Sequence, residues 1–304
     1  SFVLWVKGCR SKVGCFFDKQ VVAMSKLVLG TAQFGMDYGI SNKTGQVSLE
    51  EARKILNLAK EHHIDTLDTA SSYGDSEKIL GNIGVKDFHV ITKTASLQFD
   101  VKNVLKLFHQ SLRSLNTNNI KALLIHNIDD IKNKQFDALY TELDKLKQDK
   151  LINKIGFSTY TPDQVDFLLE NFDFDLIQVP FNVFDTRLVD GFQLQALKSK
   201  GLEIHARSVF LQGLLLDFKH LSGYFSTWKN EFDAYQKIIK DIDFSLLEYA
   251  LNFVLNTKEI DRVLVGVNSE KQLKEIIESV NKQNVLDSYP IHDTNLLNPS
   301  LWKL

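Results

Sequence analysis

Four polar residues follow or end short apolar runs in the first half of the chain. They are Asp68 in TLDTA, Tyr73 in DTASSYGDSE, Lys93 in HVITKTA and His126 in IKALLIHN. A free phenol has a pKa of about 10 and is a poor proton donor at neutral pH, but a nearby ammonium group lowers that pKa. A carboxylate bonded to the ammonium keeps it charged and in place, and a histidine beside the phenol can orient a carbonyl. Such a set forms a general acid aimed at an oxygen that gains negative charge, which suits carbonyl reduction by hydride transfer.

Each of the four also has a structural interpretation. Asp68 and Lys93 together can form an ion pair that seals a core, since buried charges are usually paired. His126 alone fits a core or rim histidine, and Tyr73 alone fits a loop aromatic. The functional interpretation depends on the three runs being neighbouring strands whose ends meet at one face.

A repeat of strand and helix signals supports that arrangement. From Lys26 onward, short apolar runs alternate with amphipathic segments at roughly thirty residues, the size of a βα unit. Capping boxes begin helices at Ser48, Thr161 and Ser269, and Lys200-Gly201 ends one. Eight runs read as nearly continuous apolar strands, typical of parallel strands covered by helices: residues 27–34, 66–70, 89–95, 120–127, 154–159, 176–182, 202–209 and 262–267.

The sequence therefore predicts an α/β fold, a single-domain (β/α)8 TIM barrel. An open doubly wound sheet is the alternative, weakened because no Gly-x-Gly-x-x-Gly follows the first strand. Residues 210–230 and the irregular tail 282–304 depart from the repeat, and we expect both to border the pocket. The expected rim of that pocket consists of Phe34, Met36, Tyr38, Phe184, Tyr224 and Trp228. Asp75 or Ser76 is expected to cap the helix after Tyr73, with Glu77 in its first turn.

Bulk properties exclude several classes of protein. The chain has 304 residues, 44% hydrophobic and 24% charged, with a net charge of −2, so there is no general attraction to nucleic acid or anionic membrane. No apolar run approaches membrane-spanning length. The two cysteines, Cys9 and Cys15, make no disulfide framework and cannot complete a zinc site alone, so we predict no metal and a cytoplasmic location.

The first 23 residues differ in character from the rest of the chain. Two interpretations stand for residues 1–23: a non-native or upstream-translated extension, and a hairpin that closes one end of the domain. Residues 24–304 form the predicted barrel with its C-terminal tail.

The four polar residues, in order and spacing, resemble the Asp-Tyr-Lys-His tetrad of the aldo-keto reductases. The resemblance runs from about Lys26 to about Val280. It includes GTAQFG, DTASSYG, TKTA, LLIHN, GFST, IQVPFN and RSVFLQGLLL, and the last two also resemble a bacterial branch that works on small carbonyls or sugar-derived compounds. It implies an NAD(P)-dependent oxidoreductase in which Tyr73 is the general acid.

The resemblance also implies how a nicotinamide cofactor would be held. Ser158, Thr159 and Gln178 would hold the carboxamide, with Thr159 in place of the usual asparagine. Gly30 and Thr31 would approach the nicotinamide ribose. Arg207 stands where many members have a stacking aromatic, and a guanidinium can stack as well or reach a phosphate. The pyrophosphate would be lined by Ser208, Phe210, Leu211 and Gly213.

The adenosine end departs further from the family pattern. Many members have a lysine-serine pair and an arginine near the start of the last helix, where this chain has VGVNSEKQLKEI. Ser269 and backbone N–H groups can still bind a phosphate, Lys271 or Lys274 can add charge, and Gln272 falls at the place of the arginine. NADP(H) is the expected cofactor, with NAD(H) as the alternative.

Three functions are compatible with these residues. The leading one is an NAD(P)-dependent carbonyl reductase or alcohol dehydrogenase acting on a small carbonyl or sugar-type substrate. The second is a nucleotide-binding, redox-sensing regulatory subunit with little turnover, and the third is a barrel lyase or isomerase that uses the lysine as a Schiff-base amine. The substrate, the reaction direction and the oligomeric state are not encoded in any pattern we recognise.

Overall fold

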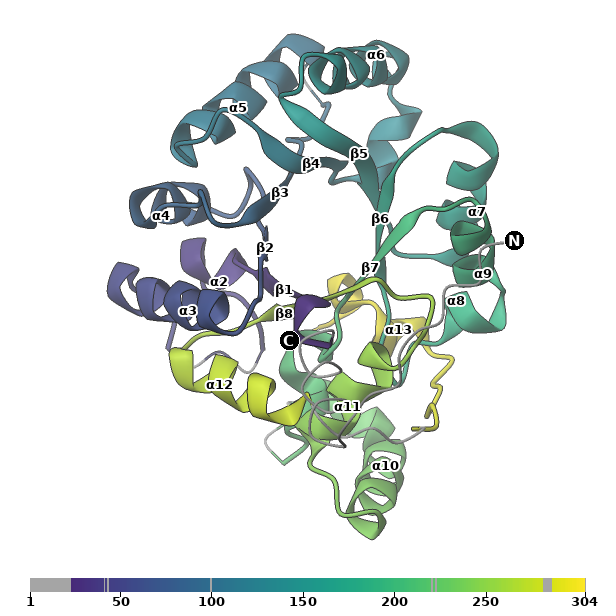
Figure 1. Cartoon of the computed structure of the whole chain (residues 1–304). Coiled ribbons are helices and arrows are strands. Elements are labelled where there is room, and N and C mark those ends of the chain that lie inside the picture. The colour runs from purple at the N-terminus through teal and green to yellow at the C-terminus, as the bar shows by residue number, and fades with distance from the viewer. Residues whose placement is uncertain are drawn as a thin grey trace, which may run out of the picture.

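Eight parallel strands close into a barrel in which each strand pairs with the next and β8 pairs with β1 (Figure 1). The computed structural model describes residues 23–40, 42, 44–98, 100–219, 221, 223–280 and 286–303. The strands are β1 Leu27–Gly30, β2 Thr66–Asp68, β3 His89–Lys93, β4 Ile120–Ile125, β5 Ile152–Ser158, β6 Leu176–Pro180, β7 Glu203–Arg207 and β8 Arg262–Gly266. The predicted (β/α)8 barrel is confirmed, and the open doubly wound sheet is wrong. Residues 1–22 lie outside the described residues, so the N-terminal extension stays a prediction.

Helices surround the barrel and connect its strands (Figure 1). The α-helices are α2 Ala32–Gly35, α3 Leu49–Glu61, α4 Ser76–Ile83, α5 Val101–Ser114, α6 Phe136–Gln148, α7 Pro162–Asn171, α8 Arg187–Asp190, α9 Gln193–Ser199, α10 Lys229–Asp241, α11 Leu246–Leu255, α12 Glu270–Ser279 and α13 Thr294–Leu297. The 3-10 helices are η1 Ile128–Lys132, η2 Leu211–Leu216, η3 Gly223–Trp228 and η4 Pro299–Leu301.

Helix starts follow the expected chemistry at most positions. Thr161 forms a complete capping box with Gln164, and Pro162 occupies the first turn. Ser48 and Ser269 each accept a hydrogen bond from the third backbone N–H of their helix. These caps satisfy N–H groups that have no partner within the helix.

The expected cap of α4 is correct in position but not in its hydrogen bond. Asp75 occupies the N-cap position, but its side chain makes no cap hydrogen bond and pairs instead with Lys78 at 2.8 Å. Ser76 is the first helical residue, and its hydroxyl turns inward to the Thr31 carbonyl oxygen at 2.8 Å. Glu77 does lie in the first turn, where it is buried and accepts a hydrogen bond from Thr92 at 2.7 Å.

The first strand is shorter than predicted. It ends at Gly30, and residues 32–35 form the short helix α2 instead of continuing the strand. Thr31 leaves the sheet because both its backbone N–H and its hydroxyl donate to the Asp68 carbonyl oxygen, each at 2.9 Å. A short apolar run cannot be assigned to strand or buried helix by its pattern alone.

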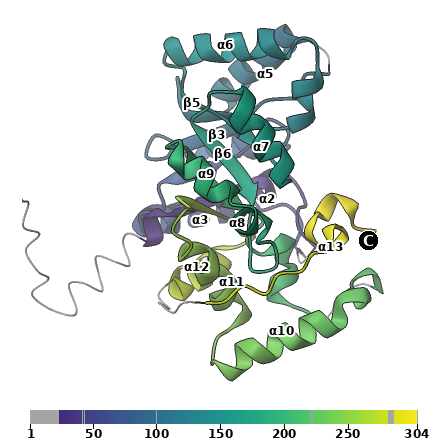
Figure 2. The same ribbon diagram turned by 90° about the vertical axis from the view of Figure 1, so that its right-hand side faces the viewer.

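The hydrophobic core has two main parts. One lies between the strands and the surrounding helices, and a small group inside the barrel consists of Ile91, Ala122, Leu124 and Leu176. The second core lies beneath the long connection after β7, helices α10 and α11, and the C-terminal tail (Figure 2). It buries Phe184, Phe225 and Trp228, so the aromatic residues of that connection serve mainly to attach the tail to the barrel.

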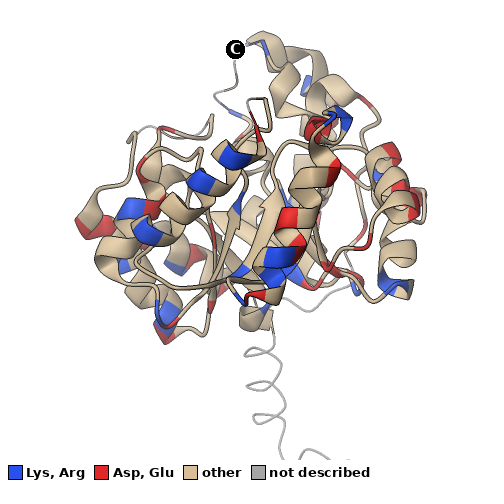
Figure 3. Ribbon diagram, turned by 90° about the horizontal axis from the view of Figure 1, so that it is seen from above, with Lys and Arg blue, Asp and Glu red and all other residues tan. Residues whose placement is uncertain are grey.

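The surface carries charges of both signs spread over the helices (Figure 3). Within the part of the chain that the structure describes, no helix is long and apolar enough to cross a membrane.

Candidate active site

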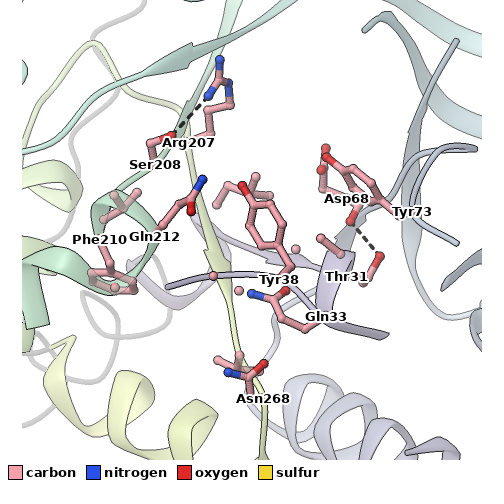
Figure 4. Close-up of a pocket in the computed structure, with 18 of the residues that line it drawn as sticks. Thr31, Gln33, Tyr38, Asp68, Tyr73, Arg207, Ser208, Phe210, Gln212 and Asn268 are labelled. Atoms are coloured by element: carbon pink, nitrogen blue, oxygen red, sulfur yellow. Dashed lines mark hydrogen bonds between the residues drawn. The ribbon is translucent and has the colours of Figure 1, made fainter. Parts of the chain in front are cut away.

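A cavity of about 450 Å³ opens at the carboxyl ends of the strands. That is the face at which barrel enzymes place their active sites, and the volume lies within the range of ligand pockets. Figure 4 shows Asp68 and Tyr73 on one side of the cavity, Asn268 on another and Tyr38 between them. The cavity therefore extends from the ends of β2 and β3 to the start of α12.

The tetrad predicted from sequence meets at one side of this cavity. Asp68 and Lys93 are the last residues of β2 and β3, and His126 directly follows β4. The Lys93 ammonium donates to Asp68 Oδ1 at 2.5 Å and to the Thr69 carbonyl oxygen at 2.9 Å. Both charged side chains are almost fully buried, each with 2% of its surface exposed. A pair this deeply buried needs further hydrogen bonds, and Gln178 Nε2 provides one to Asp68 Oδ2.

Tyr73 lies between the ammonium and the imidazole. Lys93 Nζ is 5.0 Å from the centroid of the Tyr73 ring. The His126 ring meets that ring edge-on, with the centroids 5.9 Å apart. All four side chains line the cavity, so a substrate oxygen placed beside Tyr73 would also be near His126.

The surroundings give the two basic side chains different charge states. Burial disfavours the Lys93 ammonium, but the Asp68 carboxylate and Tyr73 outweigh it and raise the pKa of Lys93. Burial and the Lys93 charge lower the pKa of His126 to about 4. Lys93 is therefore a cation and His126 a neutral hydrogen-bonding group at neutral pH. A permanently charged Lys93 does not suit the amine nucleophile that the lyase alternative requires.

A cluster of buried hydroxyl groups fixes the turn that carries Tyr73. Ser76 Oγ lies 2.9 Å from Thr31 Oγ1 and 3.2 Å from Thr69 Oγ1, and Thr31 Oγ1 in turn donates to the Asp68 carbonyl oxygen (Figure 4). The hydroxyl groups thus connect the end of β1, the end of β2 and the first residue of α4. The position of Tyr73 relative to Asp68 is determined by these contacts.

Two glycines let the backbone approach Tyr73 closely. A Cβ atom on Gly35 would lie 1.7 Å from the Tyr73 carbonyl oxygen, and one on Gly74 would lie 2.2 Å from the Gly35 carbonyl oxygen. Gly74 also has a φ of +53°, which glycine adopts without steric cost. Helix α2 therefore packs directly, backbone on backbone, against the turn that holds Tyr73.

The residues expected to hold a carboxamide are at the end of β5, just after it, and within β6. Ser158 and Gln178 line the cavity and are buried. Gln178 uses its Nε2 on Asp68, and its Oε1 is a buried acceptor with no partner among the described residues. Buried polar groups are normally satisfied, so a ligand with an N–H donor fits here. Thr159 does not line the cavity; it is fully buried, and its N–H donates to the Gln178 carbonyl oxygen.

Arg207 ends β7 and reaches across the cavity wall. Its Nη2 donates to the Thr159 carbonyl oxygen at 2.7 Å, and its guanidinium lies 4.3 Å from the centroid of the Tyr160 ring. Its Nη1 lies 3.2 Å from Ser208 Oγ (Figure 4). The guanidinium is thus held as a flat surface by stacking and hydrogen bonds.

The segment after Arg207 has an unusual backbone. Ser208, Leu211, Gln212 and Gly213 have φ values of 57°, 46°, 55° and 94°. Runs of this kind turn successive backbone N–H groups to one side, a geometry that binds anions. Ser208, Phe210 and Gly213 line the cavity, whereas the Leu211 side chain packs in the second core; their contact with a pyrophosphate stays a prediction.

The far end of the cavity is formed by the start of α12. Gln272 lines it, whereas Ser269 does not and serves as the helix cap. Asn268 and Glu275 also line it, and Asn268 Oδ1 is buried without a partner among the described residues. Sequence reasoning missed Asn268 and Glu275, although Asn268 directly follows a predicted strand end. It also missed the cavity residues Gln33 and Tyr160.

The expected rim is mostly wrong. Of the six residues expected there, the cavity lining contains Tyr38 alone. Phe34, Phe184 and Trp228 are buried in the cores. Tyr224 donates to the Asn295 carbonyl oxygen. Part of the connection after β7 does border the cavity, as predicted, whereas the described tail residues pack on the second core.

Comparisons with known proteins identify the family. The model of the Aldo/keto reductase family matches residues 26–295, most of the chain. The chain therefore belongs to the aldo/keto reductase family and is an NAD(P)H-dependent oxidoreductase.

Particular relatives cover nearly the whole chain. An uncharacterized oxidoreductase of Bacillus subtilis, YqkF, is 25% identical over 296 residues, covering 87% of this chain and 94% of the relative. L-galactose dehydrogenase of Arabidopsis thaliana is 28% identical over 260 residues, covering 78% of this chain and 80% of the relative. Among solved structures, the holo form of aldo-keto reductase AKR11C1 from Bacillus halodurans shares the fold, with a TM-score of 0.69 and 22% identity over 85% of this chain and 87% of that one.

Proposed function

We propose that this protein transfers a hydride between a nicotinamide dinucleotide and a small carbonyl or sugar-type compound, with Tyr73 as the general acid or base. The observation that carries the proposal is the meeting of Tyr73 with a charged Lys93 and a neutral His126 in one cavity. When bound, the nicotinamide supplies or accepts the hydride, which no side chain can do.

The described residues fit such a cofactor. The unpartnered Gln178 Oε1 would accept a hydrogen bond from the carboxamide, and Ser158 lies on the same wall. The left-handed segment at Ser208–Gly213 would hold the pyrophosphate. Gly30 and Thr31 line the cavity beside Asp68 and would face the nicotinamide ribose. The flat guanidinium of Arg207 would offer a stacking surface.

Proton transfer follows from the charges of the tetrad. The Lys93 ammonium stabilises the Tyr73 phenolate that remains after Tyr73 gives its proton to the substrate oxygen. Asp68 keeps that ammonium in place through the hydrogen bond at 2.5 Å. His126, neutral near pH 7, orients the substrate oxygen by a hydrogen bond and does not compete as a charged acid. In the oxidative direction, the same phenolate accepts the proton of an alcohol.

An absorbance assay at the nicotinamide band tests this function. The purified chain is incubated with reduced cofactor and a panel of aldehydes, ketones and keto sugars, and with oxidised cofactor and a panel of alcohols and aldoses. We expect turnover with at least one class of substrate. A parallel fluorescence titration measures cofactor binding in the absence of substrate.

The regulatory alternative gives a different result in the same experiment. A redox-sensing subunit would bind the dinucleotide in the titration and leave the absorbance unchanged across both panels. Failure to bind either dinucleotide would contradict both functions. For the cellular setting we propose the cytoplasm, because the chain has only two cysteines, Cys9 and Cys15, which make no disulfide framework.

A further inference from the structure

We propose that the α12 end of the cavity selects NAD(H) over NADP(H), and that Glu51 and Glu275 are the specificity-determining residues. The inference rests on the proposed function, because it concerns the dinucleotide that this function requires. It reverses the expectation from sequence, in which Ser269 and the helix N-terminus bind the extra phosphate of NADP(H).

Three backbone N–H groups at or just before the start of α12, those of Asn268, Glu270 and Gln272, already have partners. The start of a helix attracts anions because its N–H groups point outward and the helix dipole is positive there. In this chain the Glu270 N–H donates to a carboxylate oxygen of Glu51, which reaches across from α3, at 2.7 Å. The Gln272 N–H donates to Ser269 Oγ at 3.3 Å, and the Asn268 N–H donates to Gln272 Oε1 at 2.7 Å. A phosphate would have to displace a carboxylate to bind here.

The charges around this end also oppose a phosphate. Glu275 lines the cavity there. Lys271, one helical turn before it, is 85% exposed and lies 3.9 Å from the Glu275 carboxylate. Lys54 of α3 lies 3.5 Å from Glu50 and 3.6 Å from Glu51, so two carboxylates offset its charge.

The two cations that do line the cavity are committed elsewhere. Lys93 is paired with Asp68 at the catalytic end. Arg207 donates to the Thr159 carbonyl oxygen and lies over Tyr160. Among the cavity-lining residues that the structure describes, the α12 end therefore has a carboxylate and two amides, Asn268 and Gln272, and no lysine or arginine.

The same groups suit an unphosphorylated ribose. In doubly wound dinucleotide-binding folds a carboxylate accepts a hydrogen bond from the ribose 2′-hydroxyl, and Glu275 offers the same kind of acceptor to a ribose in this cavity. Asn268 Oδ1, buried without a partner in the described chain, can accept a further hydrogen bond from an adenosine N–H or O–H. NAD(H) satisfies these acceptors, whereas the 2′-phosphate of NADP(H) brings like charges together.

The test compares binding rather than turnover. Isothermal titration calorimetry of the full chain measures Kd for NAD⁺ and NADP⁺, and for the fragments AMP and adenosine 2′,5′-bisphosphate, which occupy the adenosine end alone. We expect NADP⁺ to bind at least about 10-fold more weakly than NAD⁺, since one uncompensated charge contact is worth about one factor of ten. The fragments should show the same order.

Two variants assign the effect to the named residues. Glu51→Gln combined with Glu275→Gln should reduce the ratio of the NADP⁺ and NAD⁺ dissociation constants by at least about 10-fold. Glu50→Gln is the matched control, because Glu50 is adjacent to Glu51 and its carboxylate is 83% exposed; its ratio should equal that of the wild type. If the double variant does not fold, as judged by circular dichroism, Glu275→Gln alone gives the test at an exposed position.

The outcomes separate this inference from the proposed function. Wild-type protein that binds NADP⁺ as tightly as NAD⁺ or more tightly overturns the inference and leaves the oxidoreductase function standing. A ratio that does not change in the double variant overturns the assignment to Glu51 and Glu275. Binding of neither dinucleotide overturns the proposed function and the inference with it.

Discussion

The two ends of the cavity are built in different ways. At the catalytic end, Asp68 and Lys93 are the last residues of adjacent strands and their side chains are almost fully buried. At the α12 end, Asn268, Gln272 and Glu275 lie on a loop and a helix, and Glu51 reaches in from another helix across 219 positions of sequence. The pairing of adjacent barrel strands brings the catalytic residues together. The arrangement at the α12 end depends instead on side chains of a loop and two helices, which strand pairing does not determine. We infer that the ends of the barrel strands determine the reaction chemistry, and that the loop and helices at the α12 end determine the cofactor preference.

Replacing Tyr73 should show the largest effect and separate the two ends. Tyr73→Phe removes the hydroxyl that moves the proton, so kcat should fall by about 10²- to 10⁴-fold. The Kd for NAD⁺ should change little, because the α12 end is untouched. Steady-state kinetics and calorimetry measure the two quantities.

A second tyrosine provides the matched control. Tyr235 is buried in the second core, and its hydroxyl has no partner among the described residues. Tyr235→Phe should therefore keep both kcat and the free energy of unfolding. A Tyr73→Phe enzyme with nearly normal kcat would contradict the role given to Tyr73.

The Lys93→Met variant tests how strongly the stability of the protein depends on the buried ion pair at the catalytic end. The substitution leaves the Asp68 carboxylate buried without its cation, which typically costs about 3–5 kcal/mol of unfolding free energy. At the other end, Glu51→Gln should cost less than about 1 kcal/mol, because that side chain is partly exposed. Urea unfolding of both variants measures the difference. Adding Asp68→Asn to Lys93→Met should recover part of the lost unfolding free energy, because it removes the unpaired buried charge. If Lys93→Met and Glu51→Gln lowered the unfolding free energy equally, the proposed difference between the two ends of the cavity would be contradicted.

Asn268→Ala should affect binding without affecting chemistry. Loss of one hydrogen-bond acceptor is worth about 0.5–1.5 kcal/mol, so the Kd for NAD⁺ should rise by roughly 2- to 10-fold. The value of kcat at saturating cofactor should remain that of the wild type, because Asn268 lies far along the cavity from Tyr73 (Figure 4). A fall in kcat with unchanged Kd would show that the two ends do not act separately.

The last expected effect concerns the protonation of His126. Its imidazole NMR signals should titrate with a pKa of about 4, below the ordinary value of 6.5. As the pH falls, the imidazole takes up its proton in the unfolded chain before it does so in the folded chain. The free energy of unfolding therefore falls progressively from about pH 6.5 to about pH 4, and His126 has no effect on it above pH 6.5. Urea unfolding of His126→Gln at pH 5 and pH 7.5 should show a smaller loss of stability on acidification than the wild type. A titration near pH 6.5 would contradict the neutral role given to His126.

The catalytic end was predictable from sequence because parallel strands bring their carboxyl ends together. Once the strands ending near Asp68, Lys93 and His126 were recognised, their meeting followed from the barrel, and the structure confirms it. The roles of these residues stay predictions. Strand limits were less accurate, since nothing in GTAQF shows that Thr31 would turn away to bond Asp68.

Contacts between distant segments were not predictable. The rim assignment failed because Phe184 and Trp228 pack with the tail and α10, and aromatic residues in a loop do not indicate which side they cover. The cap hydrogen bond of α4 failed because Ser76 bonds Thr31 instead of its own helix. The Glu51 contact with Glu270 joins two helices that the pattern treats separately.

The close packing of Gly35 against Gly74 has a consequence for efforts to redesign this enzyme. A library that varies the cavity walls can change substrate scope, but any side chain at position 35 would collide with the Tyr73 carbonyl oxygen. Neither Gly35 nor Gly74 lines the cavity or carries a reactive group, yet both should tolerate substitution as poorly as the tetrad. A saturation-mutagenesis map would mark them as part of the catalytic apparatus, and a designer should keep both unchanged.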